Sequence, residues 1–401
     1  MNSIQAEKNI KVYMYHKFFI GMMIIGPVLT PFLINKGLNY TQIMFLQSAA
    51  ALSRIIFEIP TGVIADKISR KLSLILSGFF MAAGLIVYMI FDNFFILVLA
   101  EIIMGIGITF SSGADSAILY ESIKGTQYEK DYSKYEATAF SRIFLGQGVG
   151  SVLSSMLFTL DKNIPFIISV FFLSVASVFA VKFIEPTFEK RNTSYILHVV
   201  QNTKNIFKSS ICIWITVFAI SFGCSNMIGY WMYEPLFKAV NIPILMYGIV
   251  FLALNLFASI SAKVYSRYFA QKNGINSLLF LSFLMVLSFL IPGIFMNIII
   301  IPVIFLQQIY RALYGPIIKN IINRNTENVF RATTISTISM FSSISYAIFL
   351  PVIGFILDNK GPQNAHVFVG MVFLAFLIVL FITGIKLKNA KARRIAKRDI
   401  A

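Results

Sequence analysis

Long apolar segments separated by short polar breaks follow one another along nearly the whole chain. Each has roughly the 20 residues that an α-helix needs to cross the hydrocarbon core of a bilayer. The pattern predicts twelve transmembrane helices, at residues 12–34, 41–65, 72–91, 94–123, 135–160, 165–184, 211–236, 242–270, 275–295, 298–322, 329–357 and 364–387. Residues 275–317 are divided between two helices because one helix of that length would reach about 65 Å, twice the hydrocarbon thickness.

The longest polar stretch begins at Glu185 and has six predicted spans on each side. We therefore expect an all-α membrane protein made of two pseudo-symmetric six-helix bundles. The expected organisation is an N-terminal bundle (1–185), a cytoplasmic linker (186–210), a C-terminal bundle (211–387) and a basic cytoplasmic tail (388–401). Such a layout is typical of two repeated halves that rock around a site near the middle of the membrane.

Composition agrees with a membrane protein. The 401 residues are 57% hydrophobic and 13% charged, with a mean hydropathy of +0.78, whereas soluble domains have about 45–50% apolar and about 25% charged residues. The polar first residues are followed by a full-length apolar span, so no removable signal peptide is expected.

The positive charges test the topology. With both termini in the cytoplasm, most of the 34 Lys and Arg residues fall on the cytoplasmic side. The exceptions are Lys36, Lys162, Lys238 and Lys360 in outer loops and Arg54, Arg142 and Arg311 inside spans. This asymmetry is the positive-inside pattern. It accounts for the net charge of +17 without a nucleic-acid partner, and it predicts a bacterial cytoplasmic-membrane protein whose basic tail lies on the lipid surface.

A charged motif follows the second span. Its residues, Gly62-Val-Ile-Ala-Asp66-Lys67-Ile-Ser69-Arg70-Lys71, resemble the loop signature of the major facilitator superfamily. Ser69 stands where the family usually has glycine, so the turn there is expected to be less left-handed. Two further segments, residues 58–62 and 112–120, look like variants found in bacterial members that are grouped with drug exporters.

The resemblance implies that this loop latches the inner gate of a transporter. Gly62 would let a neighbouring helix approach closely, and Asp66 and Lys71 would share the latch with Arg70. Arg70 can reach Glu121 at the inner end of the fourth span. The alternative is a charge cluster that only keeps the loop in the cytoplasm.

Ionisable residues inside spans are costly and usually face a cavity or a partner. Arg54 and Glu58 are four residues apart on one helix face, so they are expected to pair, with a proton-linked role for Glu58 as the alternative. Asp115 is expected to form a structural bridge with Arg142, with proton coupling as its alternative role. Glu101 has no obvious base nearby, which makes it the best candidate for reversible protonation.

The family arrangement would line a central cavity with the first, fourth, seventh and tenth spans. Aromatic and polar residues that suit an amphipathic ligand collect there. Arg311 has no evident acid in the buried spans of its own half, so it is expected to bind substrate or take part in coupling. The other candidate substrate residues are Asn226, Tyr230, Trp231, Gln307, Tyr310 and Tyr314. Trp231 has an alternative role in the interfacial aromatic belt.

Enzyme chemistry has no visible motif. The chain has no phosphate-binding loop for ATP, and its three histidines, His16, His198 and His366, are scattered, so neither a cofactor nor a metal is expected. The main hypothesis is a monomeric, proton-coupled exporter of small amphipathic molecules. The alternatives are a proton-coupled importer of a sugar, peptide or organic anion, and a non-transporting scaffold or lipid-modifying protein.

Overall fold

The computed structural model describes residues 1–186, 210–268, 274–325 and 331–398. Nearly all of these residues are helical, and none of them forms a strand. Eleven helical segments in the described chain are long and apolar enough to cross a membrane. The last, Thr337–Gly384, covers two predicted spans because α14 (Arg331–Arg398) turns at Gly361, whose φ is 79°. The predicted all-α membrane fold is therefore confirmed. The linker residues 187–209 and the last tail residues 399–401 lie outside the described residues.

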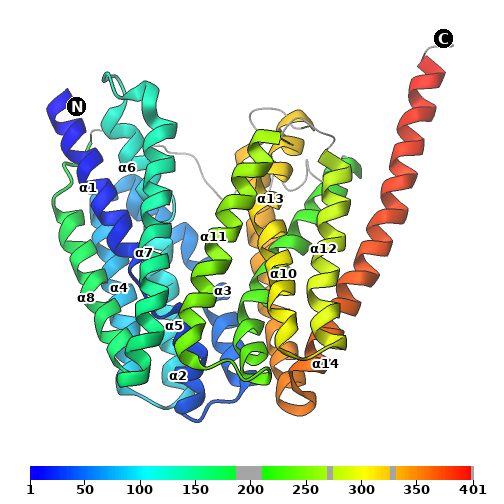
Figure 1. Ribbon diagram of the computed structural model, residues 1–401. Helices are drawn as coiled ribbons and strands as arrows, with labels where there is room; N and C mark the ends of the chain where they lie inside the picture. Colours follow the sequence, from blue (N-terminus) through cyan, green and yellow to red (C-terminus); the bar gives the residue numbers. More distant parts are fainter. Residues whose placement is uncertain (187–209, 269–273, 326–330, 399–401) are drawn as a thin grey trace. The chain divides into compact units, whose positions relative to one another are not determined.

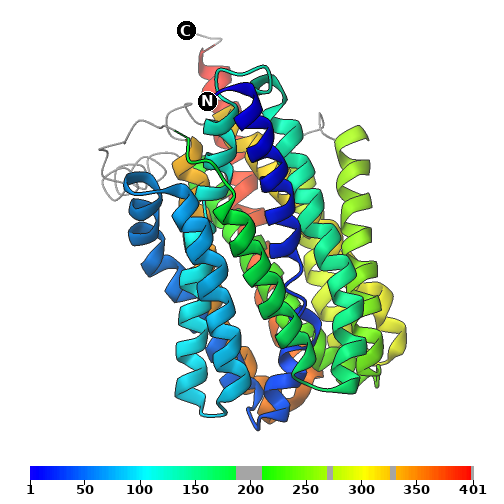
Figure 2. The same ribbon diagram turned by 90° about the vertical axis from the view of Figure 1, so that its left-hand side faces the viewer.

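The N-terminal unit comprises Met1–Thr193 together with Ile242–Asn255. Its elements are α1 (Ser3–Gly21), η1 (Gly26–Val28), α2 (Leu29–Asn35), α3 (Tyr40–Lys67), α4 (Arg70–Ile90), α5 (Phe94–Ser111), α6 (Ala114–Ile123), η2 (Glu129–Asp131), α7 (Tyr132–Leu160) and α8 (Ile164–Val181). Within this unit α1 lies against both α7 and α8, and α4 lies against α5 and α8 (Figures 1 and 2). The start of α1, the turn from α3 to α4 and the connection from α6 to α7 share one end of the unit, which we call the α3–α4 end (Figure 2).

The C-terminal unit comprises Ser194–Asn241 and Leu256–Ala401. Its elements are α10 (Ser210–Ala239), the second half of α11 (Ile244–Tyr268), α12 (Gly274–Ile294), η3 (Ile298–Ile300), α13 (Ile301–Asn325) and α14. The first half of α11 belongs to the N-terminal unit, where the backbone N–H of Gly248 donates to Ser155 Oγ at 2.8 Å. A Cβ atom at Gly248 would lie 2.0 Å from the carbonyl oxygen of Ser151. Only glycine permits this close approach of α11 to α7.

Two predicted spans of the N-terminal unit are broken. The first span is divided between α1 and α2 by η1, which contains Pro27. A proline lacks a backbone N–H and therefore interrupts a helical ladder. The fourth span is divided between α5 and α6 at Gly113, whose φ is 75°. The second break is the more consequential one, because it places Asp115 in the first turn of a new helix, where the helix dipole favours an anion.

Candidate transport site

The charged motif forms the turn from α3 to α4. Ser69 is the N-cap of α4: its φ and ψ are −167° and 129°, and its Oγ accepts a hydrogen bond from the backbone N–H of Leu72 at 2.9 Å. The backbone at Ser69 is extended, as expected where serine replaces glycine. A serine side chain in this position satisfies a helix donor that glycine leaves to solvent.

Glu185, just beyond α8, holds the same turn from the other side. Its carboxylate accepts hydrogen bonds from Ser69 Oγ (2.6 Å) and from the backbone N–H groups of Arg70 (2.9 Å) and Lys71 (3.0 Å). The sequence analysis placed Glu185 at the edge of the linker and missed this contact. The contact could not be predicted from the sequence, because the N-terminus of α4 and Glu185 are separated by more than a hundred residues and meet only in the folded structure.

The Arg70 side chain lies where the sequence predicted. Its guanidinium is 3.8 Å from Glu121 and 4.0 Å from Asp66, and it donates to the carbonyl oxygen of Ala117 at 3.1 Å. Among the described residues nothing lies within 4 Å of the position of a Cβ atom at Gly62, so the close helix approach expected there is not seen. The latch role of these residues stays a prediction.

Glu101 lies deep within the N-terminal unit and is 4% exposed. Its Oε1 accepts hydrogen bonds from Gln47 Nε2 on α3 (2.7 Å) and from the Tyr88 hydroxyl on α4 (2.6 Å). The side chains that donate these hydrogen bonds are neutral, but the positive charge of Arg54 on α3 also acts on Glu101, so the expectation that no base lies near it is wrong. Gln47 and Tyr88 have groups that donate and groups that accept hydrogen bonds, so they suit a carboxyl group in either protonation state.

Glu58 and Asp115 have partners other than the predicted ones. Ser112 Oγ, at the break between α5 and α6, donates to Glu58 Oε1 at 2.9 Å. The predicted ion pair between Arg54 and Glu58 stays a prediction. Helical spacing put these two side chains on one face, but the break in the fourth span brings Ser112 to the same carboxylate.

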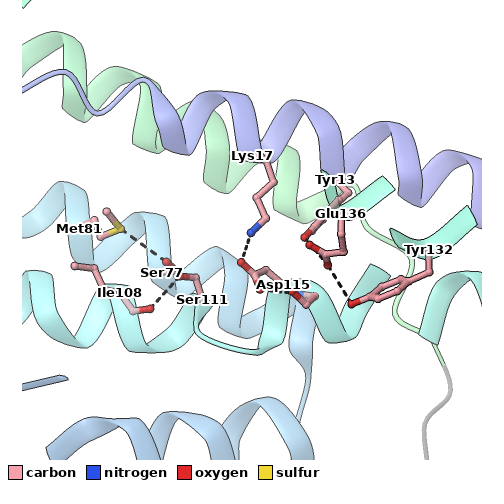
Figure 3. Close-up of polar contacts among 10 residues, drawn as sticks. Tyr13, Lys17, Ser77, Met81, Ile108, Ser111, Asp115, Tyr132 and Glu136 are labelled. Carbon is pink, nitrogen blue, oxygen red and sulfur yellow. Dashed lines mark hydrogen bonds and ion pairs between the residues drawn. The ribbon is translucent and has the colours of Figure 1, made fainter. Parts of the chain in front are cut away.

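Asp115 forms an ion pair with Lys17 of α1 and not with Arg142 (Figure 3). The reason is that α6 starts anew after Gly113 and presents Asp115 to α1, whereas Arg142 is exposed on α7. The Lys17 side chain is 9% exposed, and its ammonium lies 5.2 Å from the centre of the Tyr13 ring. The sequence analysis treated Lys17 only as one of the cytoplasmic positive charges.

A second carboxylate, Glu136, lies beside this ion pair (Figure 3). Its Oε1 accepts hydrogen bonds from the hydroxyls of Tyr13 (3.2 Å) and Tyr132 (3.3 Å). Glu136 is the second residue of the predicted fifth span and was not singled out as a site residue. Its position near a span boundary gave no signal of a buried contact.

In the C-terminal unit, the predicted substrate residues lie on α10 and α13, two helices that pack against each other. Tyr233 of α10 accepts from Gln308 Nε2 at 2.7 Å, and Gln308 Oε1 in turn accepts from Arg311 at 3.1 Å. The other predicted residues form two groups on the same helices: Asn226, Tyr230 and Trp231 on α10, and Gln307, Tyr310 and Tyr314 on α13.

Aromatic contacts join these two helices. The Phe222 ring of α10 is 5.9 Å from that of Tyr310 and stacks on that of Tyr314 at 5.8 Å. The expectation that the buried spans of this half hold no acid is wrong, because Glu234 on α10 is 8% exposed. Its place inside the span 211–236 was visible in the sequence and was overlooked. A search for groups of three or more metal-ligating side chains found none among the described residues.

The two helical units, built of long apolar helices with buried carboxylates among them, are those of an integral membrane protein. The sequence model of the Major Facilitator Superfamily matches residues 17–306, and the chain belongs to this superfamily. It is a transporter and not an enzyme.

Among curated proteins, the chain is 24% identical over 383 residues to the uncharacterized MFS-type transporter YxaM of Bacillus subtilis, covering 92% of this chain and 94% of that protein. It is 25% identical over 152 residues to the quinolone resistance protein NorA of Staphylococcus aureus, covering 37% and 39% of the two chains.

Solved transporters share the fold at low identity. The nucleoside transporter NupG superposes with a TM-score of 0.77 at 12% identity, over 96% of this chain and 99% of NupG. A POT family transporter in complex with 5-aminolevulinic acid superposes with a TM-score of 0.71 at 13% identity, over 95% and 96%.

Proposed function

We propose that the protein exports small amphipathic molecules in exchange for protons, by alternating access, as a monomer in the bacterial cytoplasmic membrane. In this proposal both termini and the α3–α4 end of the N-terminal unit face the cytoplasm, as the positive-inside pattern favours. Asp66, Arg70, Lys71 and Glu121, together with Gly62, act at the inner gate. The polar and aromatic residues of α10 and α13 contact the substrate.

The observation that carries the proposal is the environment of Glu101. A carboxyl group inside a span is a functional candidate by default, and Gln47 and Tyr88 can hydrogen-bond to it with or without its proton. Glu101 is therefore suited to bind and release a proton during each cycle. Glu58 accepts a hydrogen bond from the neutral hydroxyl of Ser112 and is a second candidate for the same work.

The similarity of part of the chain to NorA, a protein named for quinolone resistance, supports export as the direction of transport. The aromatic side chains of α10 and α13 are of the kind that suits ligands with flat apolar bodies.

The test is proton-driven uptake of a fluorescent amphipathic dye into inverted membrane vesicles. Glu101→Gln keeps the size and hydrogen-bonding capacity of the side chain but cannot exchange a proton, so we expect proton-driven uptake to disappear. Glu7→Gln is the matched control, because Glu7 is a surface acid that pairs only with Lys11 in the described contacts. Wild-type uptake that persists after the proton gradient is collapsed would refute proton coupling.

Import is the second candidate, and Arg311 favours it. The guanidinium of Arg311, bonded to Gln308 beside the α10 tyrosines, suits a carboxylate or phosphate of an anionic metabolite. If the protein is an importer, whole cells will accumulate such an anion and Arg311→Gln will abolish the accumulation. Arg142→Gln, on an exposed surface of α7, serves as the control.

A further inference from the structure

Glu234 is a buried acid of the C-terminal unit to which the proposed function gives no role. It lies on α10, directly after Tyr233 and one helical turn beyond Tyr230, and it is 8% exposed. An ionisable side chain inside a span is costly to bury and is a functional candidate by default. A role for Glu234 should therefore depend on its charge.

Arg311 brings the opposite charge to the same stretch of α10. Its guanidinium donates to Gln308 Oε1 at 3.1 Å, and Gln308 Nε2 donates to the Tyr233 hydroxyl at 2.7 Å. The positive charge of Arg311 also acts on Tyr230 and Tyr233. These two tyrosines precede Glu234 on α10 by one turn and by one residue. An acid and an arginine are thus held in one region of the α10–α13 pair.

The two helices approach each other closely in this region, and large aromatic rings line it. A Cβ atom at Gly229 of α10 would lie 2.6 Å from Gln307 Oε1 of α13, so a residue without a side chain is needed there. The Tyr230 ring is 6.4 Å from that of Tyr233 and meets that of Trp231 edge to face at 5.2 Å. Such rings suit the flat apolar body of an amphipathic molecule.

The charges of Glu234 and Arg311 balance each other. A charge that is buried without a partner is destabilising, and more so inside a membrane. A ligand with one charge of either sign gives the region a net charge. A ligand with both an ammonium and a carboxylate keeps the region neutral and offers each protein group a partner of opposite charge. The arrangement therefore favours zwitterions over cations and over anions.

We propose that Glu234 and Arg311 together select zwitterionic substrates, with Glu234 binding the ammonium group and Arg311 the carboxylate. A guanidinium can donate two parallel hydrogen bonds to one carboxylate, and Gln308 orients it for this contact. The tyrosine rings of α10 contact the apolar body of the substrate. The inference rests on the proposed function, in which α10 and α13 contact the substrate, and adds to it a residue and a substrate class.

The experiment compares three probes that share one ring system and differ in charge. At neutral pH naphthylalanine is a zwitterion, naphthylethylamine a cation and naphthylpropionic acid an anion. Their binding to the purified full-length protein in lipid nanodiscs is measured by equilibrium dialysis. We expect the wild type to bind naphthylalanine about tenfold or more tightly than either other probe, because each of those leaves one buried charge without a partner.

The variants should change which charge is preferred. Glu234→Gln leaves Arg311 unbalanced, so it should weaken naphthylalanine binding about tenfold or more and make the anion bind more tightly than the cation. Arg311→Gln should make the cation bind more tightly than the anion. Glu234→Asp keeps the charge and should keep the wild-type order of affinities. The control Glu7→Gln alters a surface acid and should leave all three affinities unchanged.

Three results would overturn the inference. They are a wild type that binds naphthylalanine no more tightly than the cation or the anion, an unchanged order of affinities in Glu234→Gln, and an equal loss for all three probes in that variant, which would show a purely structural role. Each would leave the proposed function standing if dye uptake into inverted vesicles still required the proton gradient. Wild-type uptake without a gradient would overturn the proposed function even where the preference for the zwitterion holds.

Discussion

Glu101 and Asp115 are both acids of the predicted fourth span, and the structure holds them in opposite ways. Glu101 is 4% exposed and is bonded by the neutral side chains of Gln47 and Tyr88. Asp115, beyond the break at Gly113, is bonded by the Lys17 ammonium. The two sites differ in whether the partner can accept a hydrogen bond as well as donate one.

This difference separates two uses of a buried acid. An ammonium has no lone pair, so protonation of Asp115 would leave the buried charge of Lys17 uncompensated. A tyrosine hydroxyl or a glutamine amide rearranges to serve either form of Glu101. Asp115 is therefore suited to a fixed structural pair and Glu101 to a changing charge, although both were candidates for proton coupling in the sequence.

The largest expected effect comes from breaking the ion pair at one partner. Asp115→Asn and Lys17→Met should each lower the free energy of unfolding by about 3 kcal/mol, because each leaves one charge of a partly buried pair alone. The double variant should lose much less than the sum of the two. Denaturant titration in detergent micelles measures all four proteins. Additive losses would show that the two side chains do not stabilise each other.

The second expected effect, the stability cost of Tyr88→Phe, depends on the charge of Glu101. A hydrogen bond to an ionised group contributes about 1.5–3 kcal/mol and one between neutral groups about 0.5–1.5 kcal/mol. Tyr88→Phe should therefore cost more stability at high pH, where Glu101 is ionised, than at low pH. The measurement is the same titration at two pH values, with Tyr88→Phe in the Glu101→Gln background as the control. A cost that is equal at both pH values would mean that Glu101 keeps one charge state.

The sequence was sufficient for the positions of the spans, though not for the breaks at Pro27 and Gly113, and for one contact of the predicted gate. Apolar segments long enough to cross a bilayer predict helices whatever their neighbours are. The placement of Arg70 and Glu121 at the inner ends of predicted spans anticipated their contact at 3.8 Å. The partners of Asp115 and Glu136 were not predictable in this way. They depend on the rotation of α6 after Gly113 and on which face of α1 meets α7, and neither is encoded by spacing along one helix.

Glu185 provides a third kind of carboxylate with a smaller expected effect. Two of its partners are backbone N–H groups at the start of α4, which can only donate. Like the Lys17 ammonium, these donors suit a carboxylate, and the positive end of the helix dipole favours its charge. Glu185→Gln should cost about 1–2 kcal/mol of unfolding free energy, and Ser69→Ala, which removes the N-cap side chain, about 1 kcal/mol.

The measurement of both costs is again denaturant titration. The variant Ser69→Thr is the control, because threonine keeps the hydroxyl that caps α4. If Ser69→Thr loses as much as Ser69→Ala, the cap does not account for the contribution of this side chain.

The smallest expected effect on stability concerns Arg142, which the sequence analysis predicted as the ion-pair partner of Asp115. Arg142 is exposed on α7, so Arg142→Gln should change the free energy of unfolding by less than about 0.5 kcal/mol. A true partner of Asp115 would instead show the loss expected for Lys17→Met. Combining Arg142→Gln with Asp115→Asn decides between the two bases, because additive effects exclude coupling between Asp115 and Arg142. The comparison between Asp115 and Glu101 then rests on Lys17. Its ammonium can only donate to Asp115, whereas the partners of Glu101 can hydrogen-bond to either protonation state of that carboxyl group.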